Sequence, residues 1–162
     1  MAVEDKYVNT ERAAGDRQDN VLMGGGEVVY ITQKFEVVAA DSDGSVYRVF
    51  SVPSNGVPLP GGVVYHDSIT GGTDYEFGLW YTGVGGAAVD QDCFLGSTDF
   101  ANTTTRDPFS LAMTVDNADK TFWEIAGLSS DPKVMLDWGI IGNTVGSADG
   151  TITVSARYIR KG

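Results

Sequence analysis

The chain closes with its most regular stretch, Asp149-Gly150-Thr151-Ile152-Thr153-Val154-Ser155-Ala156-Arg157-Tyr158. The pair Asp149-Gly150 is typical of a tight hairpin turn. From residue 151 onward, polar side chains alternate strictly with apolar and aromatic ones. Successive side chains of a strand point to opposite faces. The stretch therefore predicts a strand with one buried face and one solvent-facing face, in an antiparallel sheet.

Further runs rich in β-branched and aromatic residues lie toward the N-terminus and predict more strands. They cover residues 27–40, 46–52, 63–69, 75–81 and 134–141. Turn-forming Gly, Asp and Pro separate them, and residues 54–62 are expected to form a loop. In the run 75–81, we expect the face that carries Trp80 to be partly exposed.

Two short stretches predict helical turns, residues 90–95 and 119–127, because each begins with acidic or capping residues. Short strands, hairpin turns and the absence of long helical patterns together predict an all-β protein with one or two short helical turns. The expected architecture is an antiparallel β-sandwich, jelly-roll-like, formed by a single domain over residues 27–162.

Composition limits the classes of partner. The 162 residues carry a formal net charge of −11, and no cluster of Lys or Arg is present. We therefore expect neither nucleic acid nor an anionic membrane surface as a partner. Cys93 is the single cysteine, so no disulfide framework or Cys-based zinc site is predicted. We expect Cys93 to pack as a small apolar residue.

Residues 1–26 differ from the remainder and predict an extended, flexible N-terminal arm that ends at Gly24-Gly25-Gly26. The arm has no apolar segment of the kind found in secretory signal peptides. It does contain two small apolar groups, which are candidate partner-binding residues: Tyr7, Val8, Val21, Leu22 and Met23. A disordered tail, or a strand docked on its own domain, is the alternative interpretation.

No catalytic or metal site is predicted, and no cofactor. His66 is the only histidine, and no Gly-x-Ser-x-Gly motif accompanies it. Asp41-Ser42-Asp43-Gly44 looks like the start of a calcium loop, but the position that should hold the bidentate Glu is Val52. Trp80, Trp123 and Trp138 are expected either to pack in the core or to form an exposed platform for binding.

Five segments, in their order along the chain, resemble head decoration (auxiliary or cement) proteins of tailed bacteriophages. They are residues 46–53, 67–80, 89–95, 122–128 and 150–158. The resemblance implies a non-enzymatic virion protein that is made in the host cytoplasm, binds the outer surface of a capsid and stabilises it. It also implies the major capsid protein and two further copies of the chain, as a homotrimer, for partners. An arm that crosses neighbouring capsid subunits would correspond to residues 1–26.

Three other classes of function remain open from the sequence. The chain could be a different virion β protein, such as a tail-tube subunit or a head fibre. It could be a carbohydrate-binding β-sandwich module, with Trp80, Tyr81 and Trp123 as a stacking surface. An enzyme is the least supported class, because one histidine and scattered acids select no active site.

Overall fold

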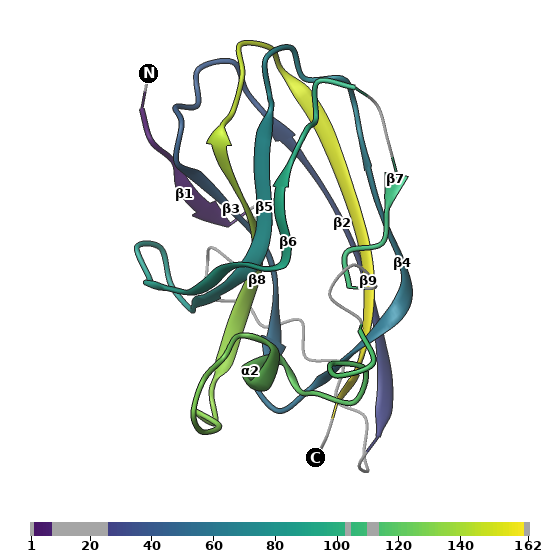
Figure 1. The fold of residues 1–162 in the computed structure, drawn as a ribbon. Helices are drawn as coiled ribbons and strands as arrows, with labels where there is room; N and C mark the ends of the chain where they lie inside the picture. The colour runs from purple at the N-terminus through teal and green to yellow at the C-terminus, as the bar shows by residue number, and fades with distance from the viewer. Residues whose placement is uncertain (1, 8–25, 103–104, 110–113, 161–162) are drawn as a thin grey trace.

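Two β-sheets face each other (Figure 1), and buried aromatic side chains fill the space between them. The computed structural model describes residues 2–7, 26–102, 105–109 and 114–160. The five-stranded sheet has the order β1 (Asp5–Tyr7), β3 (Ser45–Pro53), β8 (Met135–Thr144), β5 (Asp74–Tyr81) and β6 (Ala88–Thr98). The four-stranded sheet has the order β2 (Glu27–Val37), β9 (Gly150–Arg160), β4 (Val57–His66) and β7 (Thr105–Arg106). Within the described residues, no helix is long and apolar enough to cross a membrane.

The strand order confirms the predicted fold class, an all-β, jelly-roll-like antiparallel sandwich. From β2 to β9, each strand lies in the sheet opposite its predecessor, except for the neighbouring pair β5 and β6. Strand β1 pairs with β3 in parallel, whereas the other strand pairs within the sheets are antiparallel. This alternation between two sheets is the arrangement of a jelly-roll-like sandwich.

Strand β9 occupies an internal position and behaves as its sequence predicts. It pairs with β2 on one side and with β4 on the other. The side chains of Ile152, Val154 and Ala156 are completely buried, while the alternating Thr and Ser residues face the outside. The period-two pattern is therefore confirmed, and β9 fixes which face of its sheet is the inner one.

Two sequence predictions for local structure are wrong. Residues 90–95 form part of strand β6 instead of a helical turn, because pairing with β5 (Phe77 opposite Leu95) outweighs the local helix signal. The second half of the predicted loop 54–62 belongs to β4. Pro60 is tolerated because the pairing between β4 and β9 is interrupted between Leu59 and Val63, whereas Pro58 lies opposite Tyr158.

The second predicted helical turn is confirmed as α2 (Phe122–Ile125). The Glu124 carboxylate accepts hydrogen bonds from the Thr121 N–H at 2.9 Å and from the Thr121 hydroxyl at 2.6 Å. These bonds satisfy groups that the first turn of a helix leaves without partners. Phe122 is fully buried, so the short helix covers one end of the core.

The predicted N-terminal arm is described only at its start. Residues 5–7 form β1 against β3 of the same chain, and Ala2 forms an isolated bridge with Asp41. Tyr7 is thus placed in β1, while Val8, Val21, Leu22 and Met23 lie outside the described residues. The arm over residues 1–26 stays a prediction.

The core is held by aromatic rings that meet between the sheets. Phe109, in the turn after β7, is fully buried and contacts the rings of Phe50, Phe94, Phe122 and Trp138 at centroid distances of 5.2–6.4 Å. Tilted and edge-to-face rings at this spacing are the favoured arrangement of aromatic pairs. Phe109 therefore joins strands of the five-stranded sheet to α2.

We expect Phe109→Ala to lower the free energy of unfolding by about 3–5 kcal/mol, because truncation leaves a cavity that the surrounding rings cannot fill. Urea denaturation measures the change. Tyr65→Ala is the matched control: this ring is 55% exposed on the four-stranded sheet, so its removal should change stability little. Equal losses for the two variants would contradict the packing described here.

Candidate partner-binding surface

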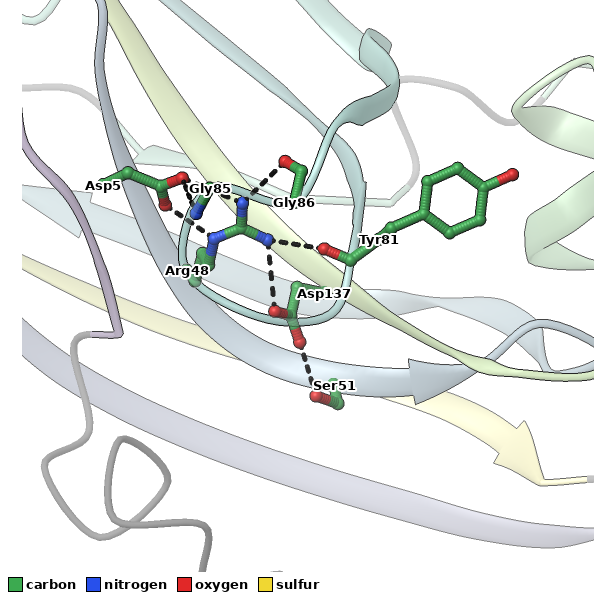
Figure 2. Close-up of polar contacts among 7 residues, drawn as sticks. All are labelled: Asp5, Arg48, Ser51, Tyr81, Gly85, Gly86 and Asp137. Carbon is green, nitrogen blue, oxygen red and sulfur yellow. Dashed lines mark hydrogen bonds and ion pairs between the residues drawn. The ribbon is translucent and has the colours of Figure 1, made fainter.

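Arg48 is the centre of a buried polar network on the five-stranded sheet (Figure 2). Its Nε and Nη2 atoms donate to the two carboxylate oxygens of Asp5 at 2.6 and 3.0 Å. Nη1 donates to the carbonyl of Tyr81 at 2.8 Å and to Asp137 at 3.3 Å. Nη2 also donates to the carbonyl of Gly86 at 2.9 Å. A guanidinium has five N–H groups, and these five bonds use them all.

The network ties together three distant parts of the sequence: strand β1, the β5–β6 turn and strand β8. Asp137, also fully buried, accepts a second bond from the hydroxyl of Ser51 at 2.6 Å. Asp5 accepts one from the N–H of Gly85 at 2.7 Å. Burial alone would lower the pKa of Arg48, but the hydrogen bonds and charges of Asp5 and Asp137 outweigh it and raise the pKa above its ordinary value. The cation is therefore a permanent structural group.

The same region corrects one expectation about the tryptophans. Trp80 was expected on a partly exposed face, yet it is 3% exposed. Its ring packs against Gly139, where an added Cβ would lie 3.2 Å from the indole. Trp138 is fully buried and stacks on Phe50 at 5.0 Å. Two of the three tryptophans therefore belong to the packed interior, and they do not form an exposed stacking platform with Trp123.

His66 is packed, and it holds no site in the described residues. It lies at the end of β4, is 4% exposed, and stacks on Phe100 with ring centroids 4.0 Å apart. Its Nδ1 lies 2.8 Å from the carbonyl oxygen of Asp67, and its Nε2 lies 3.3 Å from Nη1 of Arg106. This geometry suits a neutral ring that donates from Nδ1 and accepts at Nε2. Burial lowers the pKa of His66, and the charge of Arg106 lowers it further.

The acidic turn that resembles the start of a calcium loop makes hydrogen bonds to other parts of the fold instead. Asp41 is buried and accepts a hydrogen bond from the hydroxyl of Tyr47 at 2.8 Å. Asp43 accepts one from the N–H of Val145 at 3.0 Å. In the part of the chain that the structure describes, no three His, Cys, Asp or Glu side chains are grouped to hold a metal ion.

Cys93 is partly buried and packs against the core, where burial raises the pKa of its thiol well above the ordinary value. A thiol in this state is a poor nucleophile. The prediction that Cys93 packs as a small apolar residue is therefore confirmed.

The outer face of the four-stranded sheet carries several of the exposed large apolar and aromatic side chains of the described residues. On β2, Val28 is 55% exposed and Tyr30 is 62% exposed; on β4, Tyr65 is 55% exposed. Between them, β9 presents Thr151, Thr153 and Ser155. The charged side chains of Lys34, Glu36 and Arg157 lie on the same face. Tyrosine and arginine are enriched in protein–protein contacts. This face is the candidate partner-binding surface.

The sequence contains a signal for this surface that the choice of candidate residues missed. In β2, the side chains at odd positions point into the sandwich and those at even positions point outward. Because Phe35 is buried and odd-numbered, alternation alone places Val28 and Tyr30 on the outer face. The candidate residues chosen from sequence all fell in the arm.

Comparison with known proteins gives a fold likeness. No family model matches the chain, and no curated protein matches its sequence. The structure is similar to a chain in the capsid of Ralstonia phage GP4, with a TM-score of 0.68 and 14% sequence identity, over 97% of this chain and 99% of that chain. A chain of the cyanophage Pam1 capsid asymmetric unit also matches, with 14% identity over 90% and 94% of the two chains, but its TM-score of 0.44 carries no weight.

We expect Arg48→Met to lower the free energy of unfolding by about 3–5 kcal/mol, because it leaves the buried carboxylate of Asp137 without its cation. Lys6→Met is the matched control. Lys6 pairs with the buried Asp41 at 3.3 Å, but the Lys6 side chain is 36% exposed and Asp41 keeps the hydrogen bond from the Tyr47 hydroxyl, so its loss should cost clearly less than the loss of Arg48. Urea denaturation of both variants measures the difference. A variant at position 48 as stable as the wild type would contradict the network's structural role.

The lowered pKa of His66 predicts a pH dependence of stability. Below about pH 6.5 the unfolded state takes up a proton at this residue while the folded state does not. Stability is therefore complete above about pH 6.5 and falls as the pH drops toward the lower pKa of the folded state. We expect the wild type to lose more unfolding free energy than His66→Gln between about pH 7.5 and about pH 5. Identical losses in urea denaturation would show that His66 does not titrate as described.

Proposed function

We propose that the chain is a non-enzymatic virion protein that binds the outer surface of a tailed-phage capsid and stabilises the shell. The observation that carries this proposal is the fold likeness to a chain of the Ralstonia phage GP4 capsid. That likeness extends over nearly the full length of both chains, so it concerns the complete sandwich and not one shared motif. The order of segments along the sequence supports the same class.

The use of the buried polar groups also supports a structural protein. Arg48, Asp137, His66 and Asp41 have the burial or the charge that active sites require. Each of them instead bonds to neighbouring strands and turns of its own chain. The outer face of the four-stranded sheet is the surface that we assign to partner binding.

Stabilisation of a shell follows from many simultaneous contacts. A protein that touches more than one capsid subunit converts individually weak contacts into durable binding, because the second contact forms at a high effective concentration. The proposed partners are the major capsid protein and other copies of this chain. A trimer at threefold positions is the bound arrangement that the resemblance implies.

We expect the purified protein to bind expanded heads that lack it and to raise the temperature at which those heads release their DNA. Co-sedimentation measures binding, and the fluorescence of a DNA-binding dye during heating measures release. The control for non-specific stabilisation is the Arg48→Met variant, mixed with heads at a temperature at which this variant is unfolded and the wild type is folded. It should neither bind the heads nor raise their release temperature. Heads that remain undecorated and equally fragile at saturating protein would overturn the proposal.

A further inference from the structure

Strand β1 is bound along the edge of β3 and the turn that precedes β3. The N–H of Glu4 donates to the hydroxyl of Ser45 at 3.0 Å, and the carbonyl of Glu4 accepts from the N–H of Val46 at 2.6 Å. The carbonyl of Ala2 accepts from the N–H of Ser42 at 2.7 Å. We refer to this edge of β3, with the turn before it and the β5–β6 turn beside it, as the β1 site.

Two neighbouring side chains of β1 give the β1 site its specificity. The carboxylate of Asp5 accepts three hydrogen bonds, two from the guanidinium of Arg48 and one from the N–H of Gly85 (Figure 2). The next side chain points to the other face of the strand, where the Lys6 ammonium lies 3.3 Å from the carboxylate of Asp41. The β1 site therefore fits an extended segment in which an acidic residue is followed directly by a basic one.

Strand β1 and the next strand of the chain belong to different sheets. The three residues of β1 pair with β3, whereas β2 pairs with β9. Residues 8–25 connect the two strands. A connection of this length reaches up to roughly 60 Å when it is extended. A compact domain of this size has a radius of gyration of about 15 Å. The connection is therefore long enough for β1 to reach the β1 site of an adjacent copy.

We propose that copies of this chain exchange β1, so that the strand of one copy occupies the β1 site of a neighbouring copy. The contacts of the site are the same in the exchanged form, because every copy carries the same Asp5 and Lys6. Exchange of an identical element is a low-cost route to assembly. Because the strand and the site are different surfaces, the exchange closes either between two copies or around a threefold axis.

Concentration determines which copy supplies the strand. A connection of this length holds the strand near its own site at an effective concentration on the order of millimolar. In dilute solution each chain therefore fills its own site, as the structure shows. When copies reach a similar concentration, or lie side by side, the strand of a neighbour competes with it. This exchange goes beyond the proposed binding to a capsid and does not require it.

Disulfide trapping between two different variants detects the exchange. In a Cys93→Ala background, the donor carries Glu4→Cys and the acceptor carries Ser45→Cys. A disulfide joins donor and acceptor when β1 of the donor lies in the β1 site of the acceptor, where positions 4 and 45 are neighbours. We expect this species, identified by its mass after mild oxidation, to increase as the soluble protein is raised from micromolar to millimolar concentration.

The substitution Asp5→Asn gives the test a direction. In the acceptor it weakens the acceptor's own strand, so the concentration for half-maximal crosslinking should fall by about tenfold. In the donor it weakens the invading strand, so the same concentration should rise by about tenfold. This factor is the order expected for the loss of hydrogen bonds to a charged group. Chance collisions between cysteines would not respond in opposite directions.

Two controls make each result readable. Glu4→Cys and Ser45→Cys placed in one chain should form a disulfide within that chain, and its absence would show that β1 does not occupy the described site. An acceptor with Tyr65→Cys measures crosslinking by collision, because this ring is 55% exposed on the other sheet.

The proposal is overturned if the disulfide within one chain forms but donor and acceptor crosslink no more than the Tyr65→Cys background at any concentration. It is equally overturned if the disulfide within one chain fails to form, or if Asp5→Asn shifts crosslinking in the same direction in donor and acceptor. The samples contain no heads, so either outcome leaves the proposal of capsid binding to its own test.

Discussion

The packing of the two sheets around Phe109 and Trp138 is the constraint on which the remainder of the structure depends. Phe109 comes from a turn and not from a strand, yet its ring contacts rings of both β3 and α2. Once these rings fill the space between the sheets, each strand has an inner and an outer face. The alternation of β2 and β9 then determines which residues meet solvent: threonine, serine, valine and tyrosine, together with the charged Lys34, Glu36 and Arg157. The surface offered to partners is thus a consequence of the core.

The buried polar groups also determine where strands and turns lie. Arg48 is neutralised by two carboxylates and bound by two carbonyls, and it fastens the first strand of the chain to the sheet. A buried ion pair of this kind adds little net stability compared with apolar packing, but it tolerates only one arrangement of its partners. The position of β1 and of the β5–β6 turn follows from it.

Much of the fold could be predicted from the sequence, because local patterns of polar, apolar and turn-forming residues specify most of the strands. The alternation in residues 151–158 predicted β9, and the capping residue at the start of residues 119–127 predicted the short helix. Strand β6 was missed because its acidic start mimics a helix N-terminus, and only pairing with β5 reveals it as a strand. The Arg48 network could not be predicted at all, because Asp5, Arg48 and Asp137 are brought together by tertiary structure alone. The exposed face of β2 was within reach of the sequence, while the candidate residues Val8 and Val21 to Met23 lie outside the described residues.

The central proposal is that this chain acts by fitting its sheet surfaces against other proteins of a virus particle. Its most direct test is the amount of the chain in phage particles purified from cells that produce it, measured by quantitative mass spectrometry relative to the major capsid protein. A fixed ratio, of the order of one copy per capsid subunit and retained through density-gradient purification, is the result predicted. A chain that is abundant in infected cells but absent from the purified particles would contradict the claim.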